Sequence, residues 1–60
     1  MTNEQIKRIQ AANDAINRLE IARQGQHGEV YKNCSEAIRR WKLTIAFIEE
    51  EDTNNLSSNH

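Results

Sequence analysis

The chain carries two stripes of apolar residues, and both have the spacing of a helix. In the first stripe, apolar side chains recur at every third or fourth position, which places them along one helical face. Its members are Ile6, Ile9, Ala12, Ile16, Leu19 and Ala22. The second stripe follows the same rule and consists of Val30, Cys34, Ala37, Ile38, Trp41, Ile45 and Ile48. We therefore expect helices over about residues 3–24 and 29–51, and an all-α fold.

Short sequence signals mark the ends of these helices. Thr2 and Gln5 match the capping box, in which each side chain hydrogen-bonds the backbone amide of the other residue. Between the stripes lie Gly25 and Gly28, and each glycine would destabilise a continuous helix by about 1 kcal/mol relative to alanine. Gly25 suits the left-handed conformation that often follows a helix. The sequence thus predicts a loop over about residues 25–28.

Folding the chain about this loop gives an antiparallel helical hairpin over residues 1–52. In this register the acidic run Glu49–Asp52 falls beside Lys7 and Arg8, which offsets its unfavourable place at the negative end of the helix dipole. Residues 53–60 are mostly Asn and Ser and are predicted to form a flexible tail. The expected core consists of Ile6, Ile9, Ile16, Leu19, Ile38, Trp41, Ile45 and Ile48.

The length of the chain favours self-association, because 60 residues form a small hydrophobic core of marginal stability. A domain of this size buries only about 60% of the surface that its unfolded chain exposes, and small folds compensate with disulfides, metals or self-association. One cysteine excludes an internal disulfide. Leu43 and Phe47 lie off the main stripe, where a single hairpin would leave them exposed. They are either ordinary scattered surface residues or, as we favour, part of a homodimer interface in a four-helix bundle. The residues expected at the dimer interface are Trp41, Leu43, Ile45, Phe47 and Ile48.

Residues with metal-binding or catalytic chemistry are few and dispersed. The soft-metal ligands His27, Cys34 and His60 match no zinc-binding spacing. Cys34 lies on the second stripe, where it is expected to act as a small core residue. The carboxylates of Glu49–Asp52 sit at an open helix end, and the sequence has no glycine-rich phosphate loop. We therefore expect no metal site, no cofactor and no enzymatic activity.

Four cations cluster on the second predicted helix of a chain whose net charge is −1. These candidate partner contacts are Lys32, Arg39, Arg40 and Lys42. The simpler interpretation is a solvated face, since Glu36 precedes Arg39 and Arg40 by three and four positions and can pair with them. The alternative is contact with the acidic surface of a protein or with nucleic-acid phosphates. The acidic run would repel DNA, so a protein partner is favoured over nucleic acid.

The sequence also bears on location. The longest apolar run, Ile45–Ile48, is far shorter than the ~20 residues that span a bilayer. Charged residues interrupt the first helix from its start, unlike the apolar centre of a signal peptide. A single thiol is typical of proteins in a reducing compartment. We expect a cytoplasmic protein that does not contact membranes.

The whole chain, with its Thr2-to-Gln5 cap, hairpin glycines and two stripes, resembles the small accessory proteins encoded in the early regions of lambdoid bacteriophages. This resemblance implies a regulatory protein that modulates phage development or host physiology, with a host or phage protein as its partner. A second resemblance covers Glu36–Ile45, whose acid-Ala-apolar-basic-basic-Trp order is similar to the Kil-type inhibitors of bacterial cell division from the same phages. The acidic run Glu49–Asp52 differs from the basic end of that family.

Overall fold

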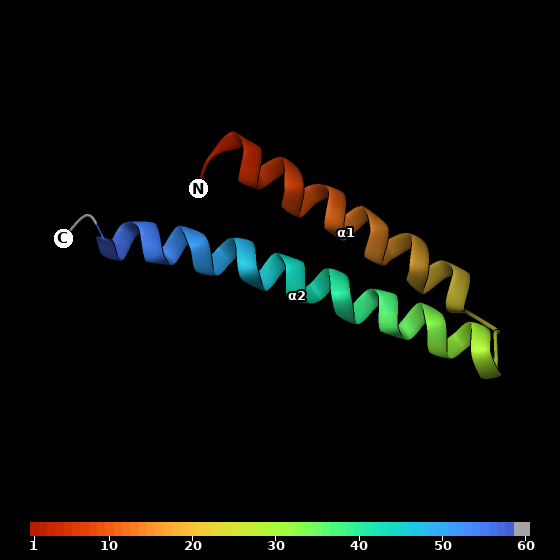
Figure 1. Ribbon diagram of the computed structural model, residues 1–60. Helices are drawn as coiled ribbons and strands as arrows, with labels where there is room; N and C mark the ends of the chain where they lie inside the picture. The colour runs from red at the N-terminus through yellow and green to blue at the C-terminus, as the bar shows by residue number, and fades with distance from the viewer. Residues whose placement is uncertain (59–60) are drawn as a thin grey trace.

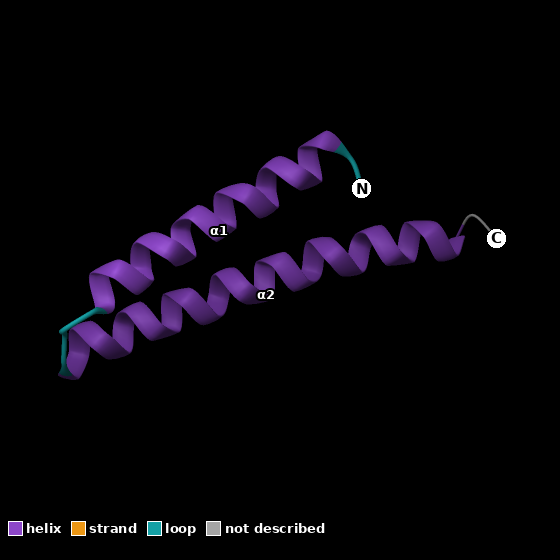
Figure 2. Ribbon diagram, turned by 180° about the vertical axis from the view of Figure 1, so that it is seen from behind, coloured by secondary structure: helices purple, strands orange, loops and turns teal. Residues whose placement is uncertain are grey.

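A computed structural model shows two helices packed against each other as an antiparallel hairpin (Figure 1). Helix α1 spans Asn3–Arg23 and helix α2 spans Gly28–Ser58. The structure describes the backbone of residues 1–58 and the side chains of residues 1–53. Viewed from behind, α2 runs back along the whole of α1 and continues past its first turn (Figure 2). The fold is therefore elongated, with extents of 49 × 17 × 10 Å.

The start of α1 is closed by the predicted capping box. The backbone N–H of Gln5 donates to the Thr2 hydroxyl oxygen at 3.1 Å, and the Thr2 N–H donates to Gln5 Oε1 at 2.8 Å. The Gln5 side chain is also buried against the hairpin, with only 8% of its surface exposed. One residue thus caps α1 and fills part of the contact between the helices.

The loop uses both of its glycines in the left-handed region of backbone space. Gly25 has φ +73° and Gly28 has φ +63°, conformations that L side chains rarely adopt. The end of α1 is satisfied locally, since the Gln24 N–H donates to Ile21 O and the Gln26 N–H donates to Arg23 O. The left-handed Gly25 predicted from the sequence is confirmed, and α2 begins at Gly28 itself.

The core lies along the line where the two helices meet. Its buried apolar residues are Ala12, Ile16, Ile38 and Ile48. Around them lie the half-buried side chains of Ile9, Leu19, Cys34 and Ile45. Two expected core residues are more exposed than predicted: Ile6 at 41% and Trp41 at 38%. In two packed helices, the residues that face the partner recur in alternating steps of four and three. In α1 this series runs through Gln5, Ile9 and Ala12, so Gln5 is buried and its neighbour Ile6 is not.

The second helix ends later than the sequence predicted. Its expected end was near residue 51, followed by a tail over 53–60, but α2 continues to Ser58. No glycine or proline interrupts residues 49–58, and the Thr53 hydroxyl donates to the Glu49 carbonyl oxygen at 3.1 Å within the helix. The acidic run is unfavourable at a helix end, but here it lies inside the helix. Of the predicted tail, residues 59–60 lie outside the described residues.

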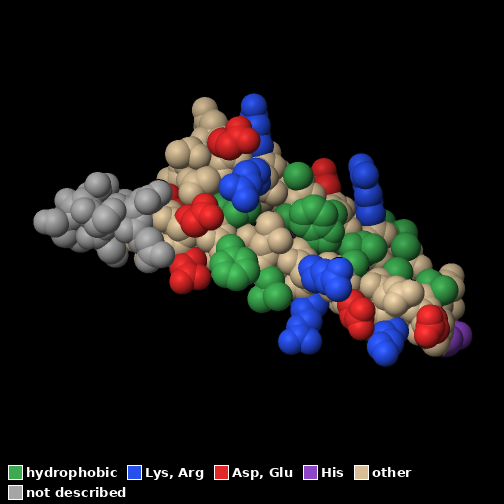
Figure 3. All heavy atoms as spheres, in the orientation of Figure 1, with side chains coloured by type: hydrophobic (Ala, Val, Ile, Leu, Met, Phe, Trp, Pro, Cys, Tyr) green, Lys and Arg blue, Asp and Glu red, His purple; other side chains and the backbone are tan. Residues whose placement is uncertain are grey.

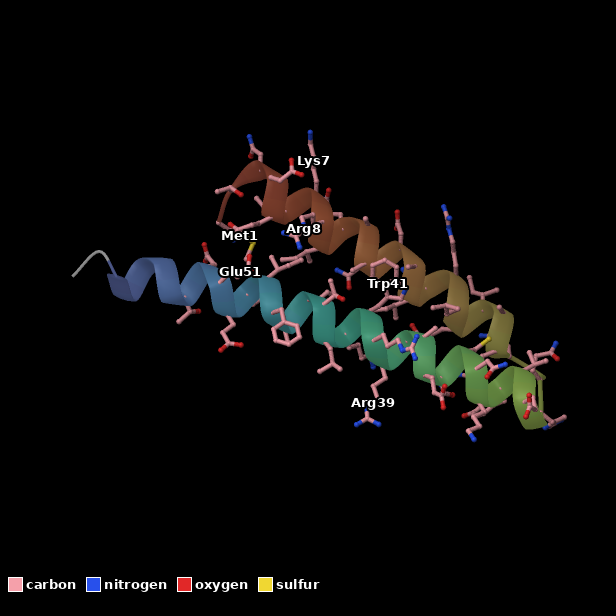
Figure 4. The ribbon with its side chains drawn as sticks, viewed as in Figure 1. Met1, Lys7, Arg8, Arg39, Trp41 and Glu51 are labelled. Carbon is pink, nitrogen blue, oxygen red and sulfur yellow. The ribbon has the colours of Figure 1, made fainter. Side chains whose placement is uncertain are left out.

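The acidic run of α2 forms an ion pair with Met1, which precedes α1. The Met1 ammonium nitrogen lies 3.0 Å from Asp52 Oδ1. Within the described side chains, Lys7 and Arg8, beside which the acidic run was expected, form no ion pair with residues 49–52. Lys7 projects away from α2 in Figure 4, whereas Arg8 turns toward it. The Met1–Asp52 contact nonetheless confirms that the start of α1 lies beside the acidic run.

Candidate interaction surface

The outward side of α2 carries large apolar side chains that the hairpin leaves uncovered. Leu43 is 52% exposed and Phe47 is 63% exposed. They stand four residues apart, so they lie on one face of the helix, one turn from each other. In Figure 3 hydrophobic side chains on this side of the molecule lie between acidic side chains toward the C-terminal end and a mixture of basic and acidic side chains toward the loop. The surface is thus mixed in chemistry and ordered along the helix.

The five residues predicted at a dimer interface divide between two places. Leu43 and Phe47 lie on the outer side of α2, as their spacing indicated. Ile48 has no exposed surface and Ile45 is half-buried, so both are already covered by their own chain. Trp41 lies over the line between the two helices (Figure 4). A second molecule approaching the outer side of α2 would therefore meet Leu43 and Phe47 alone among these five.

All four cations predicted as partner contacts are exposed; they are Lys32, Arg39, Arg40 and Lys42. Among the side chains that the structure describes, none of them forms an ion pair with a carboxylate. The ion pairs of Glu36 with Arg39 and Arg40 that the spacing allows are therefore not formed. Their donors remain directed to solvent and are available to an anionic group.

Two open grooves border this basic part of α2. The larger, of about 410 Å³, is lined by Arg23, Ser35, Ile38, Arg39, Lys42 and Leu43. The smaller, of about 380 Å³, is lined by Glu36, Arg39, Arg40 and Leu43. Arg39 and Leu43 border both grooves and so form the ridge between them. Figure 4 shows Arg39 pointing away from α1 into open space.

Arg23, which the sequence analysis did not single out, joins the two helices at the loop. Its Nη1 donates to the Ser35 hydroxyl oxygen at 3.0 Å, and its Cζ lies 5.0 Å from the centroid of the Tyr31 ring. This distance is within the range of a cation–π contact. A signal was present in the sequence, because Arg23 follows Leu19 by four positions and so continues the first stripe.

The dispersed soft-metal ligands are not brought together. His27 is exposed in the loop, Cys34 is half-buried in α2, and His60 lies outside the described residues. Within the part of the chain that was described, no three His, Cys, Asp or Glu side chains are grouped to hold a metal ion. Over the same residues, neither helix combines the length and the apolar character needed to cross a membrane. Compared with known proteins, the chain matches no family model, no curated protein and no solved structure.

Proposed function

We propose that this chain is a non-enzymatic interaction protein that works as a homodimer. The observation that carries the proposal is the pair Leu43 and Phe47, which stand exposed on the outer side of α2. Removing such apolar side chains from water is favourable, at about 25 cal/mol per Å² of buried area. A hairpin has no third layer to cover them, and a second copy would supply one. Two hairpins joined in this way make a bundle of four helices.

The partner that we propose for this dimer is a host or phage protein with an acidic surface. Arg39 and Lys42 stand at the larger groove beside the apolar side chain of Leu43. A guanidinium group binds carboxylates through two parallel hydrogen bonds, which makes an acidic helix or loop a suitable ligand. The setting that we propose for this binding, as the whole-chain resemblance implies, is the development of a bacteriophage or the physiology of its host, in the host cytoplasm.

The mass of the purified protein in solution tests the homodimer. We expect light scattering to give twice the 7.0 kDa of one chain at micromolar concentration. Circular dichroism of the same sample reports whether the helices are formed. A fully helical protein with the mass of a single chain across the concentration range would refute the proposal.

A second candidate is a regulator that binds nucleic acid through the same cations. The observation in its favour is that Lys32, Arg39, Arg40 and Lys42 have no carboxylate partner among the described side chains. Binding through these residues should retard a DNA fragment in a gel at low salt and weaken steeply as salt rises, because counterions are released from the phosphates. Absence of retardation at low salt would eliminate this candidate.

A third candidate follows from the resemblance of Glu36–Ile45 to Kil-type division inhibitors. Arg39 of this segment lines both grooves, and Glu36 and Arg40 line the smaller one, so a target could reach it. Expression in bacteria should then produce filamentous cells, and Arg39→Glu should restore normal division. Cells of normal length that contain the soluble protein would exclude this function.

A further inference from the structure

The outer side of α2 carries a charge pattern that is complementary to itself. Five exposed residues, here named the outer stripe, follow one another in steps of four and three: Glu36, Arg40, Leu43, Phe47 and Glu50. This alternation is the spacing of a coiled-coil contact. Here the two central positions of the seam are apolar, and the three outer positions are charged. It repeats, on the opposite side of α2, the type of spacing that packs α2 against α1. The stripe is therefore shaped to receive another helix.

We propose that two copies of the chain dock through α2, with their outer stripes antiparallel. In this arrangement Leu43 of one copy packs against Phe47 of the other, and Arg40 lies opposite Glu50. The two-fold axis passes between Leu43 and Phe47, next to the small, exposed side chain of Ala46. The inference rests on the proposed homodimer and specifies its geometry: the two α2 helices are central and the two α1 helices lie outside.

The charges determine the direction of docking. With the helices antiparallel, the dimer contains two Arg40–Glu50 pairs of opposite sign. With the helices parallel and in register, Arg40 would face Arg40 and Glu50 would face Glu50, which places like charges together. Both residues are exposed and have no ion-pair partner among the described side chains of their own chain. The part of the stripe that runs from Glu50 through Phe47 and Leu43 to Arg40 is the order that an antiparallel copy reverses and matches.

Charge exchange tests this pairing through the dimer dissociation constant, measured by analytical ultracentrifugation at low salt. Arg40→Glu and Glu50→Arg should each weaken the dimer by about tenfold, since each replaces two attractive pairs by two repulsive ones. The double variant restores opposite charges and should return to within about threefold of the wild type. Lys32→Glu, away from the pair, makes the same change of net charge as Arg40→Glu and should alter the dissociation constant less than about twofold.

Cysteine crosslinking tests the direction independently, in a chain that carries Cys34→Ser. Ala46→Cys lies one residue from the two-fold axis along the helix, at the side of the stripe, so a short bifunctional thiol reagent should join its two copies. Glu36→Cys is the matched control on the same stripe. In the antiparallel arrangement its two copies stand about 27 Å apart along the helix axis, so it should remain uncrosslinked.

The outcomes separate this inference from the proposed function. A monomeric wild-type protein would overturn both. A dimeric wild type whose affinity is unchanged in Arg40→Glu and Glu50→Arg would overturn the antiparallel docking alone, and so would efficient crosslinking of Glu36→Cys. Weakening in both single variants with recovery in the double variant, together with crosslinking of Ala46→Cys alone, supports it.

Discussion

At the residue scale, Gln5 combines two roles that are usually separate. Its side-chain oxygen accepts from the Thr2 N–H, and its own N–H donates to the Thr2 hydroxyl. Its side chain is also buried between the helices, where a polar group is tolerated only if its hydrogen bonds are made. Among the described side chains, every buried nitrogen and oxygen atom has a hydrogen-bond partner. The cap therefore belongs to the packed core as well as to α1.

A double-mutant cycle measures the coupling within this cap. Thr2→Ala and Gln5→Ala should each lower the free energy of unfolding by about 1 kcal/mol, because each leaves a helix-end amide without its partner. The double variant should lose less than the sum of the two, since the two hydrogen bonds depend on the same pair. Urea denaturation followed by circular dichroism gives the values, with the exposed Asn13→Ala as control. Additive losses would show that the two residues act separately.

Gly25 offers a purely conformational test. Nothing lies within 4 Å of a Cβ built on this residue, so a substitution meets no neighbouring atom and only the left-handed backbone resists it. Gly25→Ala should lower the unfolding free energy by about 1–2 kcal/mol. Gly25→Asn should lower it less, because asparagine tolerates this conformation better than alanine. Equal losses for the two variants in the same denaturation assay would contradict this explanation.

At the scale of the element, α2 presents different chemistry on opposite sides. Ile48 is fully buried against the hairpin, and its neighbour in sequence, Phe47, is 63% exposed. The buried side of α2 packs against its own chain, and the outer stripe stays exposed. Mutations at adjacent positions can therefore separate the stability of the hairpin from the proposed docking.

Alanine substitutions at Ile48 and Phe47 should differ in their effect on the free energy of unfolding. Ile48→Ala should lower the unfolding free energy by about 2–5 kcal/mol, because it opens a cavity in the small core. Phe47→Ala should change the stability of the monomer by less than about 0.5 kcal/mol, since it removes mostly exposed surface. Chemical denaturation in dilute solution compares the two. A large loss for Phe47→Ala under monomeric conditions would mean that the hairpin itself depends on this side chain.

The sequence predicted the elements better than their details, for identifiable reasons. The period of the stripes and the loop glycines placed both helices and their antiparallel contact, because local spacing alone determines these features. Spacing did not show that Ile6 and Trp41 stay partly exposed. Their exposure depends on how much of each side chain the single neighbouring helix covers, which only the packed hairpin reveals. The late end of α2 was missed because acidic residues are unfavourable at the negative end of a helix dipole, whereas residues 49–58 contain no glycine or proline that would end the helix.

The interaction surface was predictable in part. Leu43 and Phe47 were identified because their spacing sets them apart from the buried stripe. The contacts of Arg23 with Ser35 and Tyr31 were missed, because a basic residue in the last turn of a helix is ordinary and its partners follow the loop. The grooves beside Arg39 depend on how the two helices lie together, which no local pattern encodes.

At the scale of the whole molecule, the hairpin is one layer of helices with two sides in water. The exposed large apolar residues are Met1, Ile6, Ile21, Val30, Tyr31, Trp41, Leu43 and Phe47. The free energy of unfolding of a domain this small is low, so the contact between two copies would contribute a large share of the stability of the dimer. Stability and association are then coupled by mass action.

This coupling predicts a melting temperature that depends on protein concentration. The Tm of the wild-type protein should rise as the concentration increases, because dimerisation draws the equilibrium toward the folded state. The Tm of the double variant Leu43→Ala/Phe47→Ala should be nearly independent of concentration. Thermal scans by far-UV circular dichroism over a hundredfold concentration range make the comparison. A wild-type Tm that stays constant over this range would contradict a folding-linked dimer.

The Arg23 contacts also have a consequence for the order of folding. Arg23 and Ser35 are separated by only 12 positions, whereas Met1 and Asp52 lie at opposite ends of the hairpin. The entropy lost on closing a loop grows with its length, so contacts beside the glycine loop form at lower entropic cost than those at the open end. The two helices should therefore pair first beside the loop and last at the open end, where Met1 and Asp52 meet.

Stopped-flow measurements test this order of folding. Arg23→Ala should fold more slowly than the wild type, whereas Asp52→Ala should mainly unfold faster.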